Sequence, residues 1–234
     1  MWVDGTAIGL VALLFRGLYV ASIWDQPAFH VLQVNAARYD AWARLILAGS
    51  APGPPFEQGP AYPYFLSFVY ALFGPGAHAV AVVQCLIGAA TAVLVYAIGV
   101  RVHGRWGGLT AGLLAAAYAP FVYFTAEVLP ATVFVFAIAA ALAAVTLPST
   151  PAWGWAGTAW AFAYLLRSNA ILALPLVLVH AWRCGRGAAA TRLAVPFVVV
   201  ALALCAGNVV GGGELVWSTT GGGVNLWLGN NPHA

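Results

Sequence analysis

The chain has 234 residues, of which 63% are hydrophobic and only 6% are charged, and its mean hydropathy is +0.90. A typical soluble domain is about a quarter charged, so this composition excludes a water-soluble globular protein. The net charge of +3 is small and its basic residues are scattered, whereas nucleic-acid binding needs a clustered basic face. We therefore expect an integral membrane protein that binds no nucleic acid.

The apolar segments, taken in chain order, predict seven membrane helices. Crossing ~30 Å of hydrocarbon takes ~20 mostly apolar residues. The candidate segments are 5–23, 79–100, 106–120, 128–147, 153–166, 170–182 and 193–210. The fifth and sixth are shorter than a full span, so we expect them to thin the bilayer locally or to be shielded by other helices. The predicted fold class is an all-α integral membrane protein.

A longer, proline-rich and more polar stretch, 24–78, separates the first two segments. Residues 35–48 contain no proline or glycine, and their apolar residues recur every three or four positions. This spacing predicts an amphipathic helix on the membrane surface. The aromatic run 62–73 predicts a second helix that is too short to span and suits the interface, where tyrosine is enriched.

Arginines in short loops indicate the orientation, because short cytoplasmic loops are enriched in them. Arg101 and Arg105 flank one turn, and Arg183, Arg186 and Arg192 crowd another. Four predicted segments separate the two turns, so both lie on the same side. We therefore expect a cytoplasmic N-terminus and three extracytoplasmic regions, namely the loop 24–78, the turn 121–127 and the tail 211–234.

Two arginines lie within apolar stretches. Arg167 interrupts the run from Trp153 to Trp182. An unpaired arginine in the membrane is costly, so Arg167 should face a cavity or pair with an anion, and its planar fork suits a phosphate. For Arg16, in the first segment, we prefer snorkelling to the outer interface over a buried site. The three cysteines, Cys85, Cys184 and Cys205, show no metal or redox spacing, so no metal is expected.

Five stretches carry a family likeness. Residues 35–44 match the pattern Asp-Glu-x-x-Tyr-x-x-x-Ala-Arg except at its two acids, and 56–65 are similar to a Pro-Leu-Tyr-Pro-Tyr segment. Residues 119–130 lie between two spans, 166–175 are similar to an Arg-Pro-Asn segment, and 221–232 are similar to Gly-Gly-x-Asn-x-x-x-Gly-Asn-Asn-Pro. Together they resemble the bacterial GT-C superfamily of membrane glycosyltransferases, in the protein mannosyltransferase-like branch that includes the aminoarabinose lipid A transferase.

The resemblance implies transfer of a sugar from a polyprenyl-phosphate donor to an extracytoplasmic lipid, glycan or protein acceptor. It implies a multi-pass protein of the bacterial inner (plasma) membrane that contacts membrane lipids and uses no cofactor. Family members continue with further spans and often a soluble domain. Residues 1–234 are therefore expected to be the N-terminal transmembrane part of a longer chain, with 211–234 opening a later extracytoplasmic segment.

The likeness places Asn35 where the family has the aspartate that acts as general base on the acceptor hydroxyl. A neutral amide offers no carboxylate to take a proton. Asp40 is one replacement, although it lies about 140° further round a helix and can instead pair with Arg44. Glu57 or Glu127, from a neighbouring segment, is another possible replacement for the missing carboxylate. In the remaining alternative, the protein is catalytically impaired and only binds polyprenyl-phosphate lipid.

Eight substrate-binding residues are expected from the same likeness. They are Arg38, Tyr39, Gln58, Tyr62, Glu127, Arg167, Asn169 and Asn230. Two further positions depart from the family: Gly207 precedes Asn208 where relatives carry Arg-Asn, and Thr125 stands where they often have aspartate. The lost arginine makes Arg167 more important for binding phosphate. A lipid or solute transporter is the other class to weigh, but it would place its charges on broken helices at the midplane, whereas here they gather in loops.

Overall fold

The computed structural model describes residues 2–50, 53–147, 150–213, 215–222, 227, 230 and 231. Every regular element in these residues is a helix, so the chain is an all-α membrane protein. The elements are α1 (Trp2–Ile23), α2 (Pro27–His30), α3 (Val34–Leu47), α4 (Ala61–Phe73), α5 (Ala77–Ala117), α6 (Ala119–Tyr123), α7 (Ala131–Val145), α8 (Thr150–Leu166), the 3-10 helix η1 (Ser168–Ala173) and α9 (Leu174–Gly212). The helices that we predicted within 24–78 correspond to α3 and α4.

Helix α5 is a hairpin of two antiparallel segments. The chain reverses at Gly104, whose φ of 73° is a backbone conformation that favours glycine. The two segments pack closely, because a Cβ on Gly99 would lie 2.8 Å from the Cα of Gly108. These segments correspond to the predicted helices 79–100 and 106–120, and small residues are what permits such a close approach in a membrane.

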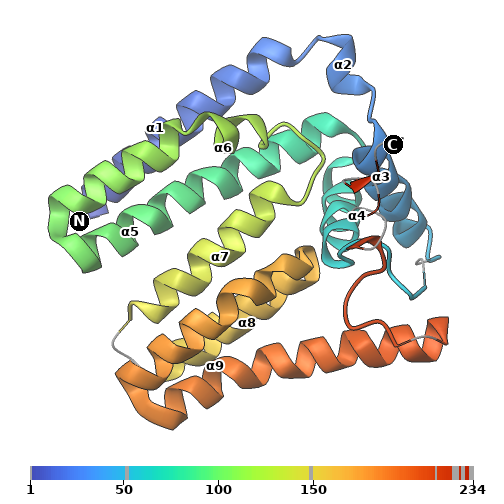
Figure 1. Ribbon diagram of the computed structural model, residues 1–234. Helices are drawn as coiled ribbons and strands as arrows, with labels where there is room; N and C mark the ends of the chain where they lie inside the picture. The colour runs from blue at the N-terminus through green and yellow to red at the C-terminus, as the bar shows by residue number, and fades with distance from the viewer. Residues whose placement is uncertain are drawn as a thin grey trace.

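Helix α9 also changes direction along its length (Figure 1). The apolar stretch Ser168–Cys184 leads back from the end of α8, and the longer stretch Gly187–Gly212 then extends beneath the other helices in this view. Helix α8 packs against the second stretch, because a Cβ on Gly157 would lie 2.3 Å from the carbonyl oxygen of Leu193. The predicted segments 153–166, 170–182 and 193–210 are thus all helical.

Within the part of the chain that the structure describes, three helices are long and apolar enough to cross a membrane: Trp2–Ile23, Ala77–Ala117 and Gly187–Gly212. The shorter apolar helices are Ala61–Phe73, Ala131–Val145 and Ser168–Cys184. At 1.5 Å per residue, α4 extends about 20 Å, which is less than the ~30 Å hydrocarbon core. This length agrees with the interfacial helix that we predicted there, while the total of seven spans stays a prediction.

Charged groups gather at the two ends of the helices. At one end, the Nε of Arg105 donates to the Oδ2 of Asp4 at 2.8 Å, and the Nη1 of Arg101 donates to the carbonyl of Ala143 at 3.0 Å. Helices α3 and α4 lie at the other end (Figure 1). The structure thus separates the arginine-rich turn 101–105 from the loop 24–78. Which end faces the cytoplasm stays a prediction, and the side chain of Arg186 lies outside the described residues.

Arg16 does not snorkel as expected. Its side chain is only 1% exposed and is enclosed by α1 and α5. Its Nη1 donates to the carbonyl of Ala12, one turn earlier, at 3.1 Å and to the carbonyl of Ala116 at 3.2 Å. The returning segment of α5 brings the second carbonyl to α1, a tertiary contact that the periodicity of α1 alone does not indicate.

A buried glutamine joins α4 to α5 and to the turn before α7. Gln84 is fully buried, and its Oε1 accepts a hydrogen bond from the hydroxyl of Tyr62 at 3.2 Å. Its Nε2 donates to the carbonyls of Thr125 at 3.0 Å and of Glu127 at 2.7 Å. This one side chain therefore satisfies three polar groups that are removed from water.

Replacing Gln84 with leucine should destabilise the protein by about 2–4 kcal/mol, because the substitution leaves the buried hydroxyl of Tyr62 and the carbonyl of Thr125 without partners, while the carbonyl of Glu127 keeps the backbone N–H of Leu129. Thermal unfolding in detergent micelles measures the loss. Gln26→Leu is the matched control, since Gln26 is exposed and its replacement should change stability little. Equal losses in the two variants would contradict the role given to Gln84.

Candidate functional site

A polar cavity of about 640 Å³ lies at the end of the molecule that carries α3 and α4. Its walls come from α3, from residues 57–59, from the turn before α7, from the connection between α8 and η1, and from residues 219–222. Seven of the predicted site residues line it, namely Asn35, Arg38, Tyr39, Glu57, Gln58, Arg167 and Asn169. We call this space the polar cavity.

Helix α3 presents its polar residues to the cavity because of their spacing. Asn35, Arg38 and Tyr39 are separated by three and four positions, so they share one face of the helix. Behind them, the rings of Tyr39 and Tyr62 pack edge to face with their centroids 5.1 Å apart. Tyr62 is fully buried against Gln84 and does not line the cavity. It therefore supports the cavity wall.

Residues 57–59 line the cavity next to α3. The Nε2 of Gln58 donates to the Oδ1 of Asn35 at 2.7 Å, and Arg38 forms an ion pair with Glu57. Because its oxygen is already engaged, Asn35 keeps its Nδ2 donors for a ligand. The geometry makes Asn35 a hydrogen-bond donor toward the cavity and leaves the acceptance of a proton to another group.

Glu57 is the one carboxylate among the described residues that line the polar cavity. Its side chain is 44% exposed and that of its partner Arg38 is 41% exposed, so a ligand in the cavity can reach both. Because an exposed ion pair contributes little to stability, the pairing serves mainly to orient the carboxylate. Glu57 is therefore the described carboxylate that a molecule in the polar cavity can reach.

Asp40 points elsewhere. Its Oδ2 accepts a hydrogen bond from the Nε of Arg44 at 2.8 Å, and its Oδ1 accepts one from the hydroxyl of Tyr70 at 2.7 Å. Burial and this hydrogen bond raise the pKa of Tyr70, so the phenol stays protonated and donates to the carboxylate. Asp40 does not line the cavity, and the pairing with Arg44 at i,i+4 is the arrangement that the structure shows.

Glu127 approaches Asn35 from a different side. The two residues line a second pocket of about 340 Å³, between the start of α3 and the turn 126–129. A hydrogen bond with Glu127 raises the pKa of Tyr123, so that phenol remains a donor to the carboxylate. Asn230 is exposed and lines neither space. Of the predicted acids, Glu57 and Glu127 thus lie beside Asn35 in two adjoining pockets.

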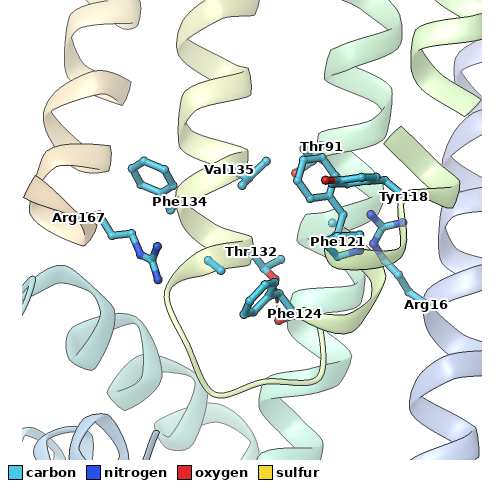
Figure 2. Close-up of a pocket in the computed structure, with 12 residues that line it drawn as sticks. Arg16, Thr91, Tyr118, Phe121, Phe124, Thr132, Phe134, Val135 and Arg167 are labelled. Carbon is cyan, nitrogen blue, oxygen red and sulfur yellow. Dashed lines mark hydrogen bonds between the residues drawn. The ribbon is translucent and has the colours of Figure 1, made fainter. Parts of the chain in front are cut away.

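Arg167 occupies an extended break in the helical chain between α8 and η1, with φ −151° and ψ 120°. It lines the polar cavity and also an apolar pocket of about 310 Å³ beside α5, α6 and α7 (Figure 2). Burial raises the pKa of Tyr39 to about 12, while the positive charges of Arg167 and Arg38 act against that rise. Arg167 has no carboxylate partner within the described part of the chain.

The polar cavity also depends on a residue whose role the sequence did not indicate. Asn208 is fully buried in α9, and its Oδ1 accepts a hydrogen bond from the backbone N–H of Phe56 at 3.3 Å. Its Nδ2 donates to the carbonyls of Val216 and Ser218, each at 2.9 Å. The sequence signal for this role was a lone amide side chain in an apolar helix. Asn208 connects α9 to the chain just before residues 57–59 and just before residues 219–222, two segments that line the cavity.

The comparisons with known proteins agree with this architecture. Residues 57–210, more than half of the chain, match the model of the dolichyl-phosphate-mannose-protein mannosyltransferase family. The chain belongs to this family. The family places the protein among membrane glycosyltransferases of the GT-C type, which confirms the resemblance. No curated protein and no solved structure matches the chain significantly.

The family match begins at Glu57 and ends at Val210. It therefore includes Arg167 and Asn208 but does not reach Asn35. The placement of Asn35 at the position of the family aspartate stays a prediction from the sequence pattern.

Two neighbouring glycines test how residues 219–222 pack at the polar cavity. A Cβ on Gly221 would lie 2.6 Å from the carbonyl oxygen of Glu57, whereas one on Gly222 would meet nothing within 4 Å. Gly221→Ala should therefore cost about 1–3 kcal/mol of stability through overpacking, and Gly222→Ala should be nearly neutral. Melting temperatures in detergent measure both variants, and equal values would show that residues 219–222 do not pack against Glu57.

Proposed function

We propose that the protein transfers a sugar from a polyprenyl-phosphate donor to an acceptor on the extracytoplasmic side of the bacterial inner membrane. The position of Arg167 is the observation that supports this most directly. Its guanidinium lies between a polar cavity and an apolar pocket and forms no ion pair with any carboxylate of the described residues. A lipid phosphate has the matching properties, because its charge complements the arginine fork and its chain remains in the bilayer.

The reaction assigns a task to each group in the polar cavity. The acceptor hydroxyl oxygen attacks the anomeric carbon of the sugar, and the bond from that carbon to the phosphate oxygen breaks. The phosphate leaves with the electron pair, and Arg167 stabilises the negative charge that develops on it. The acceptor proton passes to the Glu57 carboxylate, while Asn35 donates a hydrogen bond that orients the reacting sugar or acceptor.

A second candidate function is binding of the lipid without transfer. The amide at position 35 and the ion pair between Glu57 and Arg38 favour this alternative, because the side chains of Asn35 and Glu57 both already have protein partners. A lipid-binding descendant would keep Arg167 and the cavity and would lack an effective base. Activity measurements separate the two functions.

Under the transfer mechanism, Glu57→Gln should reduce kcat by about 10²–10⁴-fold, because the loss of a general base has an effect of that order. The assay follows a radiolabelled sugar from a polyprenyl-phosphate donor to an extracytoplasmic acceptor, with the complete gene product in membranes. Asp25→Asn serves as the control, since Asp25 is exposed and lies outside the polar cavity.

Asn35→Asp decides between the two functions. If the unmodified protein transfers no sugar and Asn35→Asp does, the protein is a lipid-binding descendant that lost its base. If the unmodified protein transfers sugar and Glu57→Gln leaves kcat unchanged, Glu57 is not the base.

A further inference from the structure

The apolar pocket contains a second arginine. Arg16 enters from α1 and Arg167 from the end of α8, and Figure 2 shows them on opposite sides of the pocket with aromatic rings between them. The other lining residues include Tyr118, Phe121 and Phe134, so the walls are mainly apolar. The proposed sugar transfer uses Arg167 and assigns nothing to Arg16.

The charge of Arg16 is not neutralised by any described residue. Its Nη1 donates to two carbonyls, while its Nε is buried and has no hydrogen-bond partner. No described carboxylate forms an ion pair with it. The negative end of the α5 dipole at Ala116 compensates only part of a full charge. An arginine removed from water without an anion is costly, so the site is suited to binding one.

The pocket holds the guanidinium in place and leaves space beside it. Gly88 makes room for it, because a Cβ at that position would lie 2.4 Å from the Nε of Arg16. The two threonine hydroxyls in the wall are occupied, since Thr91 donates to the carbonyl of Ile87 and Thr132 to that of Phe124, each at 2.9 Å. The two arginines and the hydroxyl of Tyr118 are thus the side-chain donors that this pocket offers to a ligand.

We propose that Arg16 binds the phosphate group of a membrane lipid, at a site separate from the donor phosphate at Arg167. The pocket lies beside α1 and α5, which are long and apolar enough to span the membrane. A water-soluble anion would have to enter hydrocarbon, whereas a lipid brings its phosphate there with its own chains.

The dimensions agree with this assignment. The volume of about 310 Å³ is roughly ten times the share of one water molecule in the liquid. That space accommodates one phosphate and the first carbons of a chain, so the donor phosphate at Arg167 belongs on the side of the polar cavity, which Arg167 also lines. Tyr118 lines the pocket and is 53% exposed, so the pocket reaches the outer surface and the rest of the chain can continue into the bilayer.

Native mass spectrometry of the purified full chain in detergent tests the site, with farnesyl phosphate as the probe. The unmodified protein should retain two molecules, and Arg16→Gln and Arg167→Gln should each retain one. Farnesol and inorganic phosphate serve as comparison ligands and should not be retained. Retention of two molecules by Arg16→Gln would overturn the proposal, and so would equal retention of inorganic phosphate, which would indicate a site for free anions.

A glycine variant covers the case in which Arg16→Gln does not fold. Gly88→Ala keeps the charge and displaces the guanidinium, so it should weaken one of the two binding events at least tenfold. Gly17→Ala, in the same helix as Arg16, is the matched control because a Cβ there meets nothing within 4 Å. If Gly88→Ala lowers the melting temperature and leaves the lipid count unchanged, Arg16 serves only to bind carbonyls and the proposal fails.

This inference does not depend on sugar transfer. A count of two for Arg167→Gln would contradict the donor site at Arg167 and leave the Arg16 site standing. A count of zero for both single variants would show one shared site and overturn the separate site at Arg16.

Discussion

The bilayer core contains no water, so every polar group placed there needs a partner within the protein. This chain satisfies that constraint by using few charged residues and by grouping most of them where helices end. Asp4 pairs with Arg105 at one end, and Glu57 pairs with Arg38 at the other. The polar cavity forms at this second end, where α3, the break at Arg167 and residues 219–222 meet. Its location follows from the same constraint that produced the composition.

Much of this arrangement could be predicted from the sequence. Apolar runs located the apolar helices, and the three- and four-residue spacing in 35–48 placed Asn35, Arg38 and Tyr39 on one face of α3. Asp40 lies five residues after Asn35, and it turns away as the helical period requires. The charge of Arg167 within an apolar run was enough to indicate a cavity at that position, because few other environments tolerate it.

The features that could not be predicted depend on contacts between distant segments. Arg16 was expected at the interface because the hydropathy of α1 says nothing about the carbonyl of Ala116, 100 residues later. Asn208 was noted only for the glycine before it, yet it binds the backbone of Phe56 and of residues 216 and 218. Such contacts depend on how the hairpin at Gly104 and the turn in α9 fold back. The spacing of apolar and polar residues within one helix does not indicate how distant helices fold back on one another.

The central claim is that Arg167 positions a lipid phosphate while the polar cavity receives the sugar. A cryo-electron microscopy structure of the complete gene product with a bound polyprenyl-phosphate sugar tests it most directly. The account predicts phosphate oxygens within hydrogen-bond distance, about 3 Å, of the Arg167 guanidinium, with the sugar beside Glu57 and Asn35. Phosphate density away from Arg167, or a sugar outside the polar cavity, would contradict it.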